Sequence, residues 1–264
     1  MRFDIITLFP ELFEPFLQVG ITRRAYASGQ IAVHCTNPRD FAEGNYRRVD
    51  DRPFGGGPGM VMMAEPLALA LEHVRGVRGD DQAKVVLFSP QGSRWSHPMA
   101  AQWAQGAGAI LVCGRYEGID QRFIDRHVDV QVSLGDFVLS GGEVAAMAVL
   151  DSVARLQPGV LSDEGSHQQD SFNPALDGLL DCPHYTRPEV WEGAPVPAVL
   201  LSGNHAHINR WRRDQSLLAT AQLRPELVEQ ARLQDRLQSA DEHLLASARL
   251  PGRVPGRVST QSRD

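Results

Sequence analysis

Short apolar runs alternate with helix-like stretches along the first 160 residues, and a loop follows each run. The run at 2–9 (RFDIITLF) ends at Pro10, a residue that favours the first turn of a helix. Three further runs, at 84–88, 109–113 and 128–134, each lead into a loop that contains glycine. This alternation predicts an α/β fold with a parallel sheet, whose ligand site lies in the loops beyond the carboxyl ends of the strands.

The chain changes character after residue 156. Residues 143–156 are apolar nearly all round and predict a buried helix, with Ser140 and Glu143 at the spacing of a capping box. The stretch that follows is polar and rich in turn formers, and apolar positions then recur at helical spacing. We therefore predict an α/β domain at 1–160, a linker at 161–178, a small helical domain at 179–248 and a disordered tail at 249–264.

Composition narrows the class of protein. With 42% hydrophobic and 22% charged residues, the 264-residue chain has the make-up of a globular protein and can bury a core. No apolar run approaches the ~18 residues of a membrane helix, and Asp4 and Pro10 interrupt the start where a signal peptide is apolar. We expect a cytoplasmic protein with no membrane partner. Its three cysteines, Cys35, Cys113 and Cys182, are too scattered for a disulfide framework or a Cys-x-x-Cys metal site.

The positive charge is local rather than general. The net charge is -6, yet arginines gather at two places: Arg47, Arg48 and Arg52, and again Arg210, Arg212 and Arg213. Arginine binds phosphate with two parallel hydrogen bonds and stacks on bases, so the clusters are candidate nucleic-acid contacts. For the general excess of arginine over lysine we favour a codon bias toward arginine, and the two clusters are weighed separately.

Common nucleotide-binding motifs are missing from the sequence. No G-x-G-x-x-G follows a predicted strand, and no G-x-x-x-x-G-K-[ST] occurs. The run Gly55–Gly59 (GGGPG) is too rich in glycine for a regular element, so it predicts a loop. Its backbone approaches a ligand or a neighbouring chain, or it is a plain flexible connection, and the glycines alone do not decide.

The order of longer motifs is more specific. It comprises DDRPFGGGPGM at 50–60, SPQG at 89–92, CGRYEGID at 113–120, GDFVLSGGE at 135–143, DSF at 170–172, LLDCPHYTRP at 179–188 and LLSGNHAHINRWR at 200–212. In this order the motifs resemble the bacterial tRNA (guanine-N1)-methyltransferases of the SPOUT class, in register from residue 1 to about 230. Asn173, Pro174 and Ala175 look like an insertion, and the chain beyond about 240 matches nothing in that family.

The resemblance implies a fold and a cofactor. SPOUT enzymes tie their parallel sheet into a deep trefoil knot that holds S-adenosylmethionine in a bent shape, an arrangement that no sequence rule predicts. The 55–59 loop would cover the cofactor. The cofactor-binding residues implied here are Leu87, Ser89, Pro90, Gly114, Tyr116, Glu117, Leu134, Gly135, Asp136, Phe137, Val138, Leu139, Gly141 and Gly142. Glycines in this set suit close backbone contact with a ligand, and the leucines suit an apolar lining.

The resemblance also implies a substrate and an assembly. The substrate is the guanine immediately 3′ of the anticodon in the anticodon stem-loop of tRNA, and the enzyme is a homodimer with a composite active site. Asp170 of the DSF motif is the implied base for the N1 proton, and Arg155 is the implied partner of the charge that forms on guanine O6. Without the resemblance, Asp170 reads as a solvated acid or helix N-cap, and Arg155 as an i,i+4 partner of Asp151.

Glu117 is the residue implied to touch magnesium, because the family depends on that ion. Tyr116 and Glu117 equally suit a cap for a helix that starts near Ile119, and one carboxylate is a poor cage for an octahedral ion. His205 and His207 lie on different faces of a predicted helix, which argues against zinc. We interpret Cys182 and His184 as packing and loop structure, because no third group is evident to orient them.

The helical domain offers an RNA-binding face made of Asn204, His205, Arg210, Trp211, Arg212 and Arg213. An ordinary exposed helix face is the alternative. Two other functions stay open at this point: a SPOUT-like ribose 2′-O methyltransferase, and an RNA-binding module without catalysis.

Overall fold

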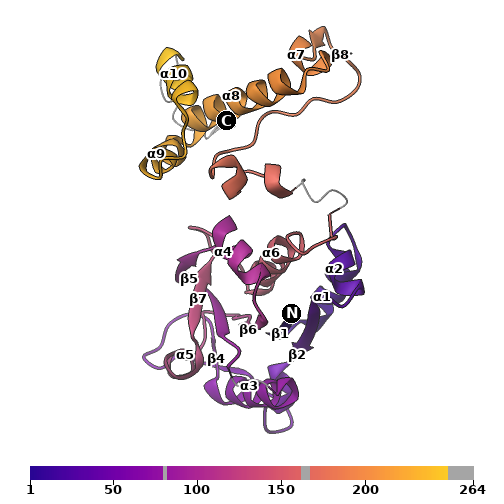
Figure 1. Ribbon diagram of the computed structural model, residues 1–264. Coiled ribbons are helices and arrows are strands. Elements are labelled where there is room, and N and C mark those ends of the chain that lie inside the picture. Colours follow the sequence, from indigo (N-terminus) through magenta and orange to yellow (C-terminus); the bar gives the residue numbers. More distant parts are fainter. Residues whose placement is uncertain (80–81, 162–166, 249–264) are drawn as a thin grey trace, which may run out of the picture. The chain divides into compact units, whose positions relative to one another are not determined.

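We analysed a computed structural model that describes residues 1–79, 82–161 and 167–248. The chain divides into two compact units, Met1–Glu164 and Gly165–Asp264, and each is described by itself (Figure 1). The predicted tail at 249–264 lies outside the described residues. Within the described part of the chain, no helix is both long enough and apolar enough to cross a membrane.

A five-stranded parallel sheet forms the centre of the first unit. Its strand order is β2-β1-β6-β5-β7, and every pairing in it is parallel. The strands are β1 (Arg2–Ile6), β2 (Ala32–Thr36), β5 (Val85–Arg94), β6 (Gly108–Val112) and β7 (Val130–Ser133). The parallel sheet predicted from the four apolar runs is confirmed. The edge strand β2 was missed, because AVHCT is partly exposed and carries no clear alternation.

Helices cover both faces of this sheet, because successive side chains of a strand point to opposite sides. Phe3, Ile5 and Leu111 pack on one face against residues of α1, α2 and α6, whereas Ile6, Leu87 and Ile110 pack on the other against α3 and α5. The helices of this unit are η1 (Pro10–Leu12), α1 (Phe13–Gln18), α2 (Arg23–Ala27), η2 (Pro38–Phe41), α3 (Ala64–Arg78), α4 (His97–Ala104), α5 (Gln121–His127) and α6 (Glu143–Ala154). A small antiparallel hairpin joins β3 (Asp50–Asp51) to β4 (Val61–Met62).

Two local predictions need correction. The buried helix at 143–156 is present as α6, but Gly142 caps it without a side-chain hydrogen bond, so the Ser140–Glu143 capping box is wrong. Glu143 is instead buried and bonded elsewhere. The SPQG loop lies within the bounds of β5, where Phe88 and Ser93 both pair with Val132. Residues 89–92 therefore protrude from the ladder, as a bulge does.

The second unit is mainly helical in its described residues. It contains η3 (His167–Gln169), η4 (Pro174–Leu176), a hairpin of β8 (Val190–Trp191) and β9 (Ala194–Pro195), α7 (Ala198–Leu201), α8 (His205–Leu223), α9 (Pro225–Leu233) and α10 (Ser239–Ser247). Its core consists of Leu179, Leu217, Val228 and Ala231. Pro174 and Ala175, two of the residues that look like an insertion in the sequence, begin η4, and the Asn173 side chain caps it by accepting from the Ala175 N–H.

Asp241 of α10 forms ion pairs with two arginines of α8, and its carboxylate is buried. Its carboxylate is fully buried, accepts from the guanidinium groups of Arg210 and Arg213, and accepts from the Gln238 backbone N–H. Burial by itself would raise the pKa of Asp241. The hydrogen bonds from Arg213 and Gln238 and the charges of both arginines outweigh burial, so the pKa lies below its usual value.

We expect Asp241→Asn to destabilise the helical unit by about 3 kcal/mol at pH 7, because the arginines lose a buried partner. A carboxyl with a lowered folded-state pKa stabilises above its unfolded pKa of about 3.9, and that contribution is lost as the pH falls through the folded value. Urea titrations should therefore show wild type and variant converging below about pH 4. Asp235→Asn, at an exposed position, is the control. If the difference in unfolding free energy between wild type and Asp241→Asn stays constant with pH, the role of Asp241 is contradicted.

Candidate active site

The 89–92 bulge of β5 and the loops that follow β6 and β7 enclose a cavity of about 400 Å³, which we call the cofactor hollow. Its size is within the ~300–1,000 Å³ usual for small-molecule sites. Most of the lining comes from 87–91, 114–119, 131–135 and 137–142, and the first two of these segments are far from the others in sequence. Every predicted cofactor-binding residue lines this hollow except Asp136.

Asp136 is the residue that the structure does not bring to the hollow. Its side chain is 91% exposed and pairs with Arg94 at 2.9 Å. The sequence offered one continuous run, 134–139, and gave no means to tell which side chains of a loop point outward. The same reasoning missed other lining residues within and beside the motifs, among them Phe88, Gln91, Arg115, Ile119, Gln131 and Ala145.

Two of the loops lie backbone against backbone at one side of the hollow. The Gly142 N–H donates to the Gly114 carbonyl at 3.0 Å, and Arg115 and Gly141 form an antiparallel bridge. A Cβ on Gly142 would lie 2.8 Å from the Cα of Cys113. Glycine is therefore required at 142 for the close approach of the two chains, as well as for any contact with a ligand.

Beneath these loops lies a buried ion pair. Arg115 Nη2 is 2.9 Å from Glu143 Oε2, and the other Glu143 oxygen accepts from the Thr7 hydroxyl at 2.8 Å. Arg115 also donates to the Ser140 carbonyl, and its guanidinium lies 4.4 Å from the Phe9 ring centroid. One side chain thus connects the ends of β1 and β6, the 139–142 loop and the start of α6.

Two potentially reactive groups beside the hollow stay neutral. Burial raises the pKa of the Cys113 thiol well above its usual value, and the Glu143 charge raises it further. The pKa of the Tyr116 phenol is raised mainly by burial and then by the neighbouring Asp50. Both residues therefore contribute shape and hydrogen bonding rather than an ionised nucleophile.

The glycine loop at 55–59 is the tip of the β3–β4 hairpin, and it contacts the wall of the hollow at one point. A Cβ on Gly59 would lie 2.5 Å from the Glu117 carboxylate oxygen Oε1. Glu117 also donates its N–H to the Met60 carbonyl, and Met62 donates to the Gly118 carbonyl. Gly55, Gly56, Gly57 and Gly59 have positive φ, a conformation that side chains disfavour.

A larger hollow of about 1390 Å³ lies between α3, α5 and the hairpin. It is bordered by similar numbers of acids and arginines, such as Glu72 and Asp120 against Arg75 and Arg126. Asp51–Phe54 of the first motif and Ile119 and Asp120 of the third border it, but none of the predicted cofactor-binding residues lines it, nor does any described residue of 87–92 or 131–142. We assign the candidate site to the smaller cofactor hollow.

The two residues predicted to act on the substrate belong to different units. Arg155 is half-buried at the C-terminal end of α6, where its N–H bonds to the Asp151 carbonyl. The Asp151 side chain accepts from Thr22. Asp170 is half-buried in the second unit, beside Phe172, whose φ is +70°. The helix N-cap suggested for Asp170 is occupied by Asn173.

The predicted RNA-binding residues differ in exposure and in their ion pairs. Arg210 and Arg213 pair with Asp241, and they pair further with Asp214 and Asp177 respectively. Arg212 is exposed, and with Tyr185, Arg187 and Trp211 it borders a hollow of about 1000 Å³. Asn204 caps α8 by accepting from the His207 N–H, and His205 begins that helix. In the first cluster, Arg47 and Arg48 make exposed ion pairs with Asp40 and Asp51.

Comparison with known proteins identifies the family to which this chain belongs. The family model described as tRNA (guanine-1)-methyltransferase TrmD matches residues 1–230. A tRNA (guanine-N(1)-)-methyltransferase of Paracidovorax citrulli is 70% identical over 249 residues, which cover 93% of this chain and 98% of the relative. Proteins of the same name from Polaromonas sp. and Bordetella pertussis are 68% and 59% identical, each over more than 90% of both chains.

The chain belongs to the TrmD family. It is a tRNA (guanine-N1)-methyltransferase, and the guanine that the family methylates is the one immediately 3′ of the anticodon. Of the three activities that the sequence left open, family membership selects base methylation over ribose methylation and over silent RNA binding. A methyltransferase of this family uses S-adenosylmethionine as its methyl donor.

The residues of this TrmD-family enzyme fit that donor. The hollow combines apolar side chains such as Leu87 and Leu139 with loop backbone at Gly114 and Gly135, a mixture that suits an adenine ring and a polar tail. A Cβ at Gly114 would make only ordinary contacts, at 3.5 Å to Ile119 and 3.9 Å to Leu87, and would project into space lined by both.

Magnesium at Glu117 fits less well. The side chain is exposed and packs on Gly59. Among the described residues, the one group of three potential metal ligands is Asp181, Cys182 and His184, which does not include Glu117. A lone carboxylate does not make a cage for an octahedral ion. The alternative role suggested for Tyr116 and Glu117, a cap for the following helix, is filled by Asp120, whose side chain accepts from the Arg122 N–H at the start of α5. Magnesium at Glu117 stays a prediction, and no step below uses it.

We expect Glu143→Ala to lower the free energy of unfolding by about 3 kcal/mol, because it leaves the Arg115 guanidinium without its buried partner. S-adenosylmethionine affinity should fall with it, since Arg115 holds the 139–142 loop. Urea titration and calorimetric titration of the cofactor measure the two effects. The exposed Glu72→Ala is the control. If Glu143→Ala matches that control in both measurements, the ion pair does not organise the hollow.

Proposed function

We propose that S-adenosylmethionine binds in the cofactor hollow and that Asp170 and Arg155 act on the target guanine. The observation that carries this proposal is the convergence of the predicted cofactor residues, from three separate loops, on one cavity in a TrmD-family chain. The methyl donor, when bound, supplies an electrophilic methyl group whose bond to sulfur breaks as the new bond to N1 forms.

The chemistry left to the protein is proton transfer and charge stabilisation. Guanine N1 carries a proton at neutral pH, and that proton must leave for the nitrogen lone pair to attack the methyl carbon. The Asp170 carboxylate takes the proton as general base. As the proton leaves, negative charge gathers on guanine O6, where the Arg155 guanidinium stabilises it by hydrogen bonding. The target base leaves its stack so that N1 becomes accessible.

We expect Asp170→Asn to cut kcat by ~100-fold or more, with the fold and cofactor affinity intact, because the amide cannot accept the N1 proton. Arg155→Lys should also lower kcat more than binding, because an ammonium does not reproduce the planar guanidinium. Single-turnover methylation of a tRNA transcript measures both, with Asp235→Asn as the control. Wild-type turnover by Asp170→Asn at saturating substrate would remove Asp170 from the role of base.

We further propose that α8 and the segment before it bind the tRNA. The set is Asn204, His205, Arg210, Trp211, Arg212 and Arg213, and exposed Arg212 beside Trp211 and Tyr185 is its best-supported part. Aromatic rings suit stacking on unpaired bases, and guanidinium groups suit phosphate. Arg47, Arg48 and Arg52 extend the contact on the first unit. Because tRNA is the substrate, the enzyme works in the cytoplasm.

We expect Arg212→Ala to weaken tRNA binding and to reduce the slope of log Kd against log salt by about one, as one lost phosphate contact does. Arg213→Ala should instead lower the thermal midpoint, because Arg213 holds Asp241 and Asp177. Filter binding over a salt series, with S-adenosylmethionine titration as the control, separates the two. A salt slope that Arg212→Ala leaves unchanged would mean that this guanidinium faces solvent.

We also propose that the sheet is knotted and that the enzyme is a homodimer with composite sites. Two close backbone contacts support a knot. Gly92 lies against the backbone of Gln131, and residues 141–142 lie against residues 113–115. For the dimer, the support is family membership. In a composite site, Asp170 of one subunit serves the cofactor hollow of the other.

A mixture of two inactive variants tests the composite site. We expect Asp170→Ala and Gly114→Val homodimers to be inactive, the second because its side chain fills the hollow. Heterodimers should regain one working site, so random reassortment should restore roughly a quarter of wild-type activity, as two-fold symmetry requires. Demonstrably mixed dimers without activity would mean that each site is built within one chain.

A further inference from the structure

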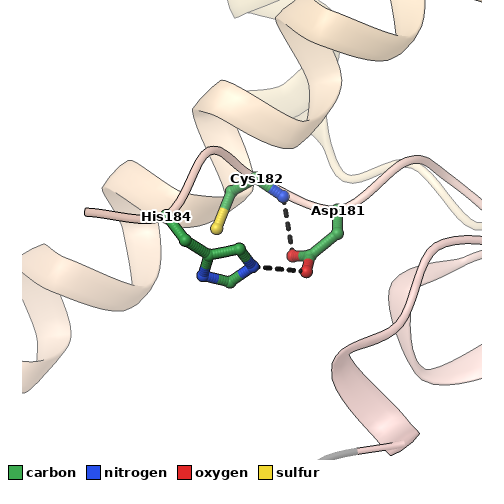
Figure 2. Close-up of side chains that lie close together, drawn as sticks. All are labelled: Asp181, Cys182 and His184. Atoms are coloured by element: carbon green, nitrogen blue, oxygen red, sulfur yellow. Dashed lines mark hydrogen bonds and ion pairs between the residues drawn. The ribbon is translucent and has the colours of Figure 1, made fainter. Parts of the chain in front are cut away.

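Three potential metal ligands lie together in the second unit, in the extended segment that precedes β8. Figure 2 shows Asp181, Cys182 and His184 with their side chains turned toward one another. His184 Nε2 is 2.7 Å from Asp181 Oδ2, and the Cys182 N–H donates to Asp181 Oδ1 at 2.6 Å. The sulfur, the imidazole nitrogen and a carboxylate oxygen all lie within 4.8 Å of one another.

Sequence reasoning set Cys182 and His184 aside because no third group was evident. The structure supplies that group in Asp181, the neighbour of Cys182. The signal was present as the run Asp-Cys-Pro-His, but sequence alone does not show that a carboxylate folds back toward an imidazole three residues later.

The donor set is specific in its chemistry. A thiolate, an imidazole and a carboxylate together suit a borderline-soft ion such as Zn²⁺, whereas Mg²⁺ and Ca²⁺ prefer oxygen alone. Ligand atoms in a tetrahedral zinc site are roughly 3.3–3.7 Å apart, as bonds of about 2.0–2.3 Å require. Here the His184 Nε2 to Asp181 Oδ2 distance is 2.7 Å, and all three ligand atoms lie within 4.8 Å of one another.

The backbone that carries these ligands is held in place. The Leu180 N–H donates to the Thr220 hydroxyl of α8, and the Ser216 hydroxyl donates to the Leu180 carbonyl. The Asp181 N–H donates to the Ser171 hydroxyl at 2.9 Å. Pro183, between two of the ligands, fixes its own φ. A fixed backbone reduces the entropy that binding must offset.

The exposure of the three residues also allows an ion to enter. The Cys182 residue is 7% exposed, the Asp181 side chain 26% and the His184 side chain 69%. An ion can therefore enter from the imidazole side and reach a sulfur that is shielded from solvent. Three protein ligands leave the fourth tetrahedral position to water.

We propose that Asp181, Cys182 and His184 bind one thiophilic divalent cation of the zinc class, with an open fourth position. The three ligands belong to the second unit, whereas the cofactor hollow belongs to the first, and the proposal does not depend on the roles proposed for Asp170 or Arg155.

Cobalt titration of the full chain, without an affinity tag and stripped of metal by a chelator, tests this site. We expect one equivalent of Co²⁺ to produce a thiolate-to-cobalt charge-transfer band and the visible bands of four-coordinate cobalt, and Zn²⁺ to abolish both. Cys182→Ser should lose the charge-transfer band. The mostly exposed His184→Asn, which disturbs packing least, should raise the Kd for Co²⁺ by at least about tenfold.

Cys35→Ser and His207→Asn are the matched controls, since each removes a thiol or an imidazole elsewhere in the chain, and both should bind Co²⁺ like wild type. Circular dichroism establishes that each variant is folded. The proposal is overturned if wild type gives no charge-transfer band, if His184→Asn keeps wild-type affinity, or if Cys35→Ser removes the band. Because the readout is spectroscopic, loss of methyl transfer would not affect it.

Discussion

The ion pair between Arg115 and Glu143 is the contact on which the rest of the candidate site depends. A carboxylate that is 99% buried is costly unless it is paired and hydrogen-bonded, and Glu143 meets that requirement through Arg115 and Thr7. The pair holds together segments that are far apart in sequence: the end of β1, the loop after β6 and the loop before α6. Gly141 lies against both side chains, so the glycines of this loop serve packing as well as ligand access.

The residues proposed for binding and for chemistry are divided between the two units. The first unit carries the cofactor hollow and Arg155, and the second carries Asp170 and the α8 surface. Hydrogen bonds connect the Asp170 segment to the rest of its own unit, because Phe172 donates to the Leu179 carbonyl and Asp181 to the Ser171 hydroxyl. The segment of the proposed base is thus hydrogen-bonded to the segment that carries the candidate metal ligands.

Sequence reasoning predicted what depends on local pattern and missed what depends on contacts across the fold. Apolar runs predicted the parallel sheet, and the loops after them predicted the hollow. The edge strand β2 was missed because its apolar pattern is weak, and Asp136 was misplaced because a loop gives no periodicity. The second arginine cluster looked uniform in sequence, but Asp241, some 30 residues away, pairs with Arg210 and Arg213 and leaves Arg212 exposed. Glu143 had the spacing of a cap, and only tertiary structure shows its pairing with Arg115.

We propose that the 89–92 bulge of β5 and the loops after β6 and β7 form the cofactor site. Amide hydrogen exchange of the full chain with and without S-adenosylmethionine tests it most directly, because exchange reports local opening segment by segment. We expect slower exchange at 87–92, 114–118 and 134–142, with α3 unchanged. Protection confined to α3, with those three segments unaffected, would place the cofactor in the larger hollow and contradict this assignment.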